Sequence, residues 1–368
     1  MVKKIGIIGL GNVGVAVLAS FEKYSSLIFR RTSFKIEIKK ICDRDKLKEK
    51  KVKKFSIPFT TNPLDLINDP DIDIIVELIG GIEPAYTLIA KSFKKGKSVV
   101  TANKALLATK GKDIISLAKK ANKCIGFEAA VCGAIPLIKN ISEGLISCEI
   151  KKIYGILNGT TNYILYKMLK ENIDFKTSLK EAQRRGLAEK KPKLDIEGID
   201  ALYKLCILSY LCYGIWPLPD KVYTEGISKI SLLDIVYAQE LNYTIKLLAV
   251  AKKEKGDLEL RVQPTLLPKD HALAQVPLAY NAVYFDTKPA GELLFYGKGA
   301  GGVPTSSSVI SDIVNISSGN KSFLPKQEKI KIRNIKNIKS RYYIRFMAED
   351  RPGVLAQISK ILSLPKTN

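Results

Sequence analysis

The feature that most restricts the fold of this chain is a glycine-spaced turn near its N-terminus. Residues 3–14, KKIGIIGLGNVG, form a short apolar strand ending in Gly9-x-Gly11-x-x-Gly14, and the following VAVLASFEKY has helical spacing. The first glycine permits a tight turn, the second lets a pyrophosphate approach the backbone, and the third lets helix and strand pack closely. Free N–H groups of the helix N-terminus then face the phosphates. We predict a dinucleotide site; the alternative is a glycine turn with a structural role only.

A second predicted strand, residues 35–45, ends in two residues that bear on the nucleotide. Asp43 would hydrogen-bond the adenosine ribose of NAD, whereas Arg44 could accept the 2′-phosphate of NADP. Because both are present, the choice between NAD and NADP stays open. The two side chains could also pair with each other or face solvent.

Strands and helices alternate over residues 1–130. Further strands are predicted at 72–81, 97–104 and 124–131, and further helices at 84–96 and 113–122. This alternation favours an α/β, Rossmann-type fold, in which a doubly wound parallel sheet binds its ligand at the carboxyl ends of the strands.

The pattern changes at Cys132, and residues 131–296 mix helices with half-exposed, alternating strands. We predict an inserted α+β domain for substrate binding and dimerisation, since such an antiparallel sheet can cover a substrate or pair with a second subunit. A glycine cluster from Gly297 leads into a helix expected to return to the first domain, which residues 297–320 would complete.

The C-terminal part is predicted to be less compact. Residues 321–340 are rich in Ser, Asn and Lys and resemble a linker. Residues 341–368 have the pattern of one strand, a turn and one helix. Because such a unit cannot bury a core, it must dock elsewhere or stay loose.

Composition excludes several classes of protein. The net charge of +24 would suit a nucleic-acid partner, but the lysines occur in almost every segment without interleaved aromatic residues, so we expect none. No apolar run reaches the roughly 18 residues of a membrane span, and the first strand leaves no room for a signal peptide. We expect a cytoplasmic protein without a membrane partner. The six cysteines form no CxxC pair, which argues against a disulfide framework or a zinc site.

An acid and an amine lie four residues apart before an apolar helix. This spacing puts Asp200 and Lys204 on one helix face. A lysine that opens an apolar helix usually has a partner, and the pair could be a simple ion pair or could serve proton transfer.

Five motifs together resemble homoserine dehydrogenase, in order and at the expected separations over residues 3–320. They are VELIGGIEPAYTLIAKSFKKGKSVVTANKALLA, GFEAAVCGAIPLI, GILNGTTNYIL, RRGLAEKKPKLDIEGIDALYK and GKGAGGVPTSSSVISDIV. The resemblance implies reversible reduction of L-aspartate 4-semialdehyde to L-homoserine with NAD(P)H. The tail YYIRFMAEDRPGVLAQISKIL resembles the opening of an ACT domain, an amino-acid-sensing module, with only its first strand and helix present.

The resemblance also implies catalytic and substrate residues. Reduction of an aldehyde by hydride requires a proton donor. Lys204 matches the family's donor, with Asp200 orienting it, and Lys104 matches a second active-site lysine between cofactor and substrate. The chain's one histidine, His271, lies outside every motif and is expected at the surface. The residues implied to hold the substrate are Glu189, Asp195 and Asp200 for its ammonium group and Thr160 for its carboxylate; NGTT could otherwise be only a helix cap.

Two further sites rest on the resemblance. The cofactor residues it adds are Asn12, Val13, Asn103, Lys104, Gly186 and a glycine of the second cluster, Gly301 or Gly302. A monovalent cation, sodium or potassium, is implied at Glu128 with the backbone of Val131, Gly133 and Ile135, because hard cations prefer oxygen ligands. The alternative is a buried glutamate that caps the turn.

Departures from the family pattern bear on affinity and regulation. Lys191 replaces an acid after Glu189, which changes the charge beside the pocket, and Asn242 replaces a glycine at a position where asparagine is tolerated. Because the ACT-like segment is short, we predict no feedback control by threonine through it. Two other functions stay open: another NAD(P)-dependent oxidoreductase of amino-acid semialdehydes, and a non-catalytic nucleotide-binding sensor.

Overall fold

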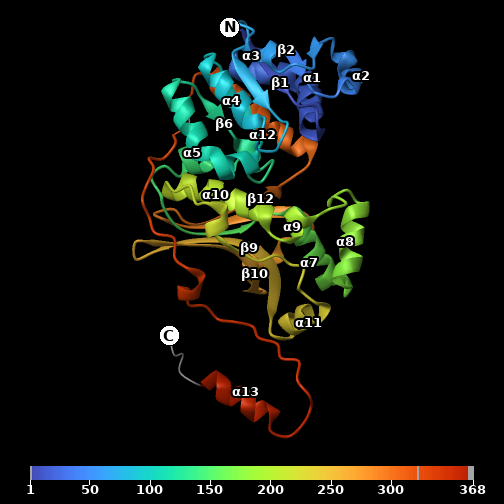
Figure 1. Ribbon diagram of the computed structural model, residues 1–368, viewed down its shortest axis with the longest axis vertical. Helices are drawn as coiled ribbons and strands as arrows, with labels where there is room; N and C mark the ends of the chain where they lie inside the picture. Colours follow the sequence, from blue (N-terminus) through green and yellow to red (C-terminus); the bar gives the residue numbers. More distant parts are fainter. Residues whose placement is uncertain (1, 321–322, 364–368) are drawn as a thin grey trace. The chain divides into compact units, whose positions relative to one another are not determined.

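The computed structural model describes residues 2–320 and 323–363 of the chain (Figure 1). It divides into two compact units, residues 1–338 and 339–368. None of the described helices is both long and apolar enough to cross a bilayer. The predicted α/β fold class is confirmed by the first unit, which contains two six-stranded sheets.

The first sheet is parallel throughout, with strand order β3-β2-β1-β4-β5-β6. Its strands are β1 (Val2–Ile8), β2 (Lys35–Cys42), β3 (Phe59–Thr60), β4 (Ile74–Glu77), β5 (Ser98–Thr101) and β6 (Ile125–Gly126). The central strands are apolar because helices cover both faces of a parallel sheet. These helices are α1 (Asn12–Thr32), α4 (Ala85–Lys94), α5 (Lys104–Lys120) and α12 (Gly302–Ser317).

Helix α12 comes from the far end of the first unit and packs along α1, next to the first sheet in Figure 1. The hydroxyls of Ser20 and Ser306 lie 2.8 Å apart in this contact. Small side chains on both helices allow this close approach. The glycine cluster that precedes α12 is thereby brought next to the start of α1.

The second sheet has strand order β12-β11-β7-β9-β10-β8. Its strands are β7 (Glu149–Ile156), β8 (Tyr223–Thr224), β9 (Tyr243–Glu254), β10 (Asp257–Pro268), β11 (Tyr280–Lys288) and β12 (Gly291–Lys298). All pairings are antiparallel except that of β8 with β10. Helix α10 (Ile199–Tyr213) packs against both α5 and the strands of this sheet, so it lies between the two sheets (Figure 1).

Several shorter elements complete the described chain. The other helices are α2 (Glu49–Val52), α3 (Leu64–Ile67), α6 (Leu137–Lys139), α7 (Gly159–Glu171), α8 (Phe175–Arg184), α9 (Lys193–Ile196) and α11 (Leu232–Glu240). Single turns are η1 (Lys46–Lys48), η2 (Lys53–Phe55), η3 (Glu128–Ala130), η4 (Asn140–Gly144), η5 (Pro219–Lys221), η6 (Ala272–Gln275) and η7 (Ile335–Asn337).

The segment expected to be a linker packs against the first unit where it is described. Leu258 N donates to the Lys331 carbonyl, and Arg333 N donates to the Leu258 carbonyl, both at 2.9 Å. In the second unit only the helix forms, as α13 (Val354–Ser363). The predicted strand before it is wrong over the described residues, because a strand needs a neighbouring strand and the described part of this unit contains no second one.

Candidate active site

Helix α10 places an acid and an amine on one buried face. Asp200 and Lys204 lie one turn apart, with 4% and 6% of their surface exposed. Lys204 Nζ donates to Asp200 Oδ2 at 2.7 Å and to the Leu157 carbonyl oxygen at 2.5 Å. Because an ammonium carries three N–H groups, one of them remains for a further acceptor.

Lys104 contacts the same carboxylate from the start of α5, the helix that follows β5 of the first sheet. Its Nζ forms an ion pair with Asp200 Oδ1, and 43% of its side chain is exposed. Burial would raise the pKa of Asp200, but the two lysines outweigh burial and hold that pKa well below its usual range. Burial likewise acts to lower the pKa of Lys204, and the Asp200 carboxylate outweighs it, so this pKa lies above its usual value. Lys204 therefore keeps its proton at neutral pH.

Asn158 gathers two carboxylates at the start of α7. Its Oδ1 caps the helix by accepting from Thr161 N at 2.8 Å. Its Nδ2 donates to Asp195 Oδ1 at 2.7 Å and to Asp200 Oδ2 at 2.9 Å. Burial raises the pKa of Asp195. Two acids therefore converge beside the lysines, an arrangement suited to a cationic group.

The other two predicted substrate residues lie differently. Thr160, in the first turn of α7, donates its hydroxyl proton to the Leu187 carbonyl at 2.7 Å, so its side chain can offer a ligand only an acceptor. The unpaired backbone N–H groups of that helix turn are the donors left for a carboxylate. Glu189 is exposed in the loop before α9, whereas Asp195 is half-buried and Asp200 is buried.

The first glycine cluster has the shape that a dinucleotide requires. Gly9 has φ of 108°, and a Cβ at Gly14 would lie 2.1 Å from the Gly9 carbonyl oxygen. A Cβ at Gly11 would meet no heavy atom within 4 Å, so the space beside it is open to a phosphate. The second glycine therefore borders the ligand, while the other two keep the turn closed.

The second glycine cluster lies next to the first, at the start of α1. Gly301 has φ of 107°, and a Cβ at Gly302 would lie 2.7 Å from the Asn12 carbonyl oxygen. Asn12 and Val13 form the first turn of α1, so predicted cofactor residues from both ends of the first unit meet there. Asn103 caps α5 by accepting from Leu106 N at 3.1 Å and donates to the Gly81 carbonyl at 2.6 Å.

Asp43, the residue predicted to bind the ribose, makes hydrogen bonds within the protein itself. Asp43 is buried and accepts from Leu10 N at 2.7 Å, Asp45 N at 3.0 Å and Lys48 Nζ at 2.9 Å. Burial would raise the pKa of Asp43, but these donors outweigh it and hold the pKa below its usual value. Arg44 is exposed. Gly186, with φ of 71°, lies in the exposed turn after α8.

The candidate cation ligands already make hydrogen bonds. The Glu128 carboxylate accepts from Ile138 N and Lys139 N, both at 2.8 Å, and so caps the following helical turns. The Gly133 carbonyl accepts from the Ser308 hydroxyl at 2.6 Å, and the Ile135 carbonyl accepts from Leu137 N at 2.7 Å. A carbonyl or carboxylate oxygen has a second lone pair, so this oxygen set still fits a hard monovalent cation.

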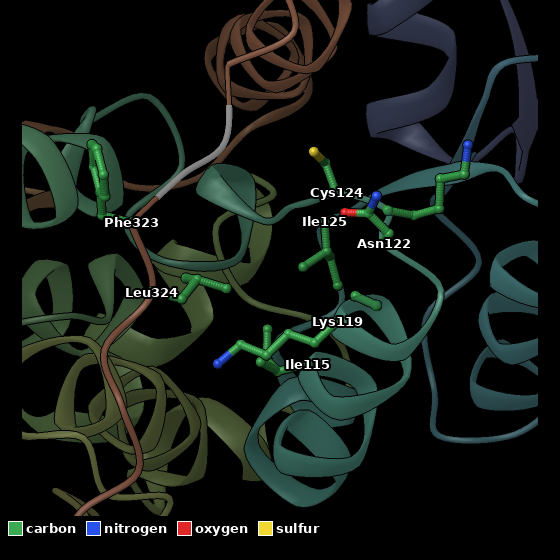
Figure 2. A pocket seen from close by; sticks show the side chains of 9 residues that line it. Ile115, Lys119, Asn122, Cys124, Ile125, Phe323 and Leu324 are labelled. Atoms are coloured by element: carbon green, nitrogen blue, oxygen red, sulfur yellow. The ribbon is translucent and has the colours of Figure 1, made fainter.

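Two other features lie outside this site. His271 Nδ1 accepts from Leu273 N at 3.1 Å and caps a single turn. A cavity of about 370 Å³ lies between the end of α5, the segment after it, and the chain at Phe323 and Leu324 (Figure 2). None of the predicted site residues lines that cavity.

Sequence reasoning did not assign roles to two buried asparagines in the site. The position of Asn158 before a predicted helix could have indicated a helix cap, because asparagine is a common cap residue. No sequence pattern indicates its hydrogen bonds to two distant acids. Asn281, at the start of β11, donates to the Leu157 carbonyl at 2.8 Å, the same oxygen that Lys204 contacts. These two positions are 124 residues apart, and no local pattern connects them.

A family model described as homoserine dehydrogenase matches residues 136–314, and one described as homoserine dehydrogenase, NAD binding domain, matches residues 9–128. The chain is 43% identical over 362 residues to the homoserine dehydrogenase of Helicobacter pylori, covering 98% of this chain and 85% of that protein.

Solved structures agree. A homoserine dehydrogenase from Thiobacillus denitrificans has a TM-score of 0.92 at 40% identity, covering 99% of this chain and 86% of the other. A hyperthermophilic archaeal homoserine dehydrogenase in complex with NADPH has a TM-score of 0.75 at 29% identity, covering 88% and 100%.

Proposed function

The chain belongs to the homoserine dehydrogenase family of NAD(P)-dependent oxidoreductases, and we propose that Lys204 is the proton donor as the pocket around Asp200 reduces L-aspartate 4-semialdehyde to L-homoserine. The observation that carries this assignment is the remaining N–H of a buried ammonium, whose other two N–H groups are directed at Asp200 and Leu157. A donor fixed in this way has one direction left for a substrate oxygen.

Nicotinamide, when bound, supplies the hydride to the aldehyde carbon. The aldehyde oxygen then gains negative charge, and the Nζ–H bond of Lys204 breaks as its proton passes to that oxygen. Asp200 keeps Lys204 charged until this step and orients it. In the reverse direction the neutral amine accepts the proton of the homoserine hydroxyl.

The two charged groups of the substrate are assigned to different parts of the site. We assign its ammonium to Asp195 and Asp200, which Asn158 holds together, with Glu189 as a third acid if its loop closes over the substrate. Its carboxylate is assigned to the N–H groups of the first turn of α7, beside Thr160. Lys104 forms an ion pair with Asp200 and is the first residue of α5, directly after Asn103. In this proposal it lies between the substrate and the cofactor.

We propose that NADPH is accepted as cofactor. Support comes from Asp43, whose oxygens are engaged by Leu10, Asp45 and Lys48, and from exposed Arg44 beside it, which is free to meet a 2′-phosphate. Substituting Arg44→Ala should raise the KM for NADPH and leave that for NADH unchanged. Equal KM changes for the two cofactors would contradict this assignment.

A cation and a second subunit complete the proposal. Sodium or potassium at Glu128, with the carbonyls of Val131, Gly133 and Ile135, would tie the turn after η3 to the start of α6. A homodimer through the second sheet is supported by exposed apolar side chains on its edge strand β12, Leu294 and Tyr296. Titration of activity with each salt and analytical ultracentrifugation test these two points.

The test of function follows reduced nicotinamide by absorbance. Wild type should oxidise NADPH or NADH with aspartate semialdehyde, and Lys204→Ala should lose about 10²-fold or more in kcat. Lys253→Met, an exposed lysine on β9, is the control and should behave as wild type. A wild-type protein that consumes neither cofactor would overturn the function, and a fully active Lys204→Ala would overturn the donor.

A further inference from the structure

A single carbonyl oxygen links the proton donor to a residue outside the pocket's charged groups. The Leu157 oxygen, at the end of β7, accepts from Lys204 Nζ at 2.5 Å and from Asn281 Nδ2 at 2.8 Å. Asn281 has 1% of its surface exposed. A carbonyl has two lone pairs, so both donors fit, and each helps fix where the oxygen points.

The Asn281 amide has no freedom to move away from this oxygen. A Cβ at Gly299 would lie 2.0 Å from Asn281 Cγ, so the glycine backbone packs directly on the amide. On another side, Asn281 Nδ2 lies 3.6 Å from Cys132 Sγ. A rotated amide would bring its oxygen toward the Leu157 oxygen, which is repulsive, so the donor must face the carbonyl.

The loop before Asn281 is anchored by a second buried group. Asn162 Nδ2 donates to the Leu278 carbonyl at 2.8 Å, and Lys246 Nζ donates to the Val276 carbonyl at 2.7 Å. Both anchors are almost completely buried. The loop that leads into β11 is thus held by hydrogen bonds at residues shortly before Asn281.

One polar atom of Asn281 has no structural use in the described chain. Its Oδ1 is buried and accepts no hydrogen bond from the described residues. An ordinary core asparagine would have both ends of its amide satisfied. The donor end alone is used, and it is used on the oxygen that holds Lys204.

We propose that Asn281 is a positioning residue for the proton donor: it fixes the Leu157 carbonyl on which the Lys204 ammonium rests, so that the remaining N–H of Lys204 points at the substrate oxygen. This inference rests on the proposed role of Lys204. Without the Asn281 donor, the Leu157 peptide can tilt and carry the ammonium with it. The proton transfer would then slow while the binding of substrate and cofactor stays intact.

A double-mutant cycle tests the proposal with wild type, Asn281→Leu, Lys204→Ala and the double variant. Asn281→Leu should lower kcat by about tenfold or more with KM values within about threefold, because positioning affects the proton transfer. The solvent deuterium isotope effect on kcat should rise. The double variant should lose no more than Lys204→Ala alone.

The results distinguish a wrong assignment of Lys204 as donor from a wrong assignment of Asn281 as positioning residue. If Lys204→Ala is as active as wild type, the proposed donor is wrong. If Lys204→Ala is impaired but the two losses multiply in the double variant, the donor stands and the role of Asn281 is overturned.

Two further variants guard against a folding defect. Asn281→Asp has the same shape but no N–H for the Leu157 carbonyl, and it should lose kcat as well; full activity in this variant would overturn the proposal. Thr287→Val removes a buried polar group from the same strand, where Thr287 donates to the Gly291 carbonyl. It should leave kcat and the isotope effect as in wild type.

Discussion

Lys204 on α10 and Lys246 on β9 are both buried, but their pKa values are shifted in opposite directions. Lys204 contacts the Asp200 carboxylate, which outweighs burial and keeps its pKa above the usual value. Among the described residues, Lys246 donates to two neutral oxygens, those of Asn162 at 2.8 Å and Val276 at 2.7 Å. Burial therefore lowers the pKa of Lys246 to about 8.

Burial alone therefore does not make a lysine a proton donor. A buried ammonium without a carboxylate tends to lose its proton, and Lys246 needs only the two N–H groups that a neutral amine also has. A carboxylate at hydrogen-bond distance keeps the proton on the amine until a stronger base forms beside it.

The largest effect is expected from removing the carboxylate. In Asp200→Asn, Lys204 loses the carboxylate that does most to offset burial, so the pKa of Lys204 falls and its proton is lost more readily before hydride transfer. We expect kcat/KM for aspartate semialdehyde to fall by about 10²- to 10⁴-fold. The free energy of unfolding should fall by about 3–5 kcal/mol, since a buried ammonium loses its partner.

Steady-state rates and urea denaturation measure both effects. Asp220→Asn, an exposed carboxylate, is the control and should change neither quantity. If Asp200→Asn kept the wild-type rate, the contrast between the two lysines would have no bearing on catalysis.

Lys246 provides the next effect, on stability and its pH dependence. Below about pH 8 the folded and unfolded chains both hold this proton, so the group gives no slope. Between about 8 and the ordinary value of 10.5 the unfolded chain binds more protons, so the free energy of unfolding rises with pH. This rise, on the order of 3 kcal/mol, should be missing in Lys246→Met.

The measurement is urea denaturation of both proteins from pH 7 to about pH 10. Lys253→Met, an exposed lysine on the same strand, should keep the wild-type slope. A slope that is unchanged in Lys246→Met would mean that the amine stays charged in the fold, and the comparison would fail.

Asn158→Ala should loosen the two acids of the site without removing either one. Asn158 donates to both Asp195 and Asp200, so its loss should let the two carboxylates separate. We expect the KM for aspartate semialdehyde to rise by about tenfold, the value of one charge-assisted hydrogen bond. Initial rates over a range of substrate concentration test this; an unchanged KM would exclude Asp195 from substrate binding.

The smallest effect is expected at an exposed lysine. Lys191 stands where the family pattern has an acid, but it is solvent-exposed, and an exposed charge contributes at most about 1 kcal/mol. Lys191→Asp should lower the KM for aspartate semialdehyde by no more than about fivefold, with kcat unchanged. A change above tenfold in either constant would show that this side chain enters the pocket.

The features of the fold and the site that could be predicted are those determined by residues close together in the sequence. Gly9 and Gly14 were predictable because the turn geometry itself excludes a side chain, at φ of 108° and at 2.1 Å from a carbonyl. The shared face of Asp200 and Lys204 followed from helical periodicity. Both inferences use distances of a few residues along the chain.

Features that depend on distant contacts were not predictable. Asn281 and the Leu157 carbonyl meet across 124 residues, and backbone oxygens have no residue signature. The Thr160 hydroxyl is used by the Leu187 carbonyl, a contact that its motif does not reveal. The strand expected after residue 340 was wrong because its sequence pattern suits a strand, whereas strand formation requires a partner.

The role of Lys204 is tested best by the kcat of Lys204→Ala with and without added methylammonium, which replaces the missing amine. We expect kcat to fall by about 10²-fold or more and to be partly restored as methylammonium is increased, while the KM for NADPH stays the same. A Lys204→Ala variant that turned over at the wild-type rate without added amine would contradict the claim that Lys204 supplies the proton.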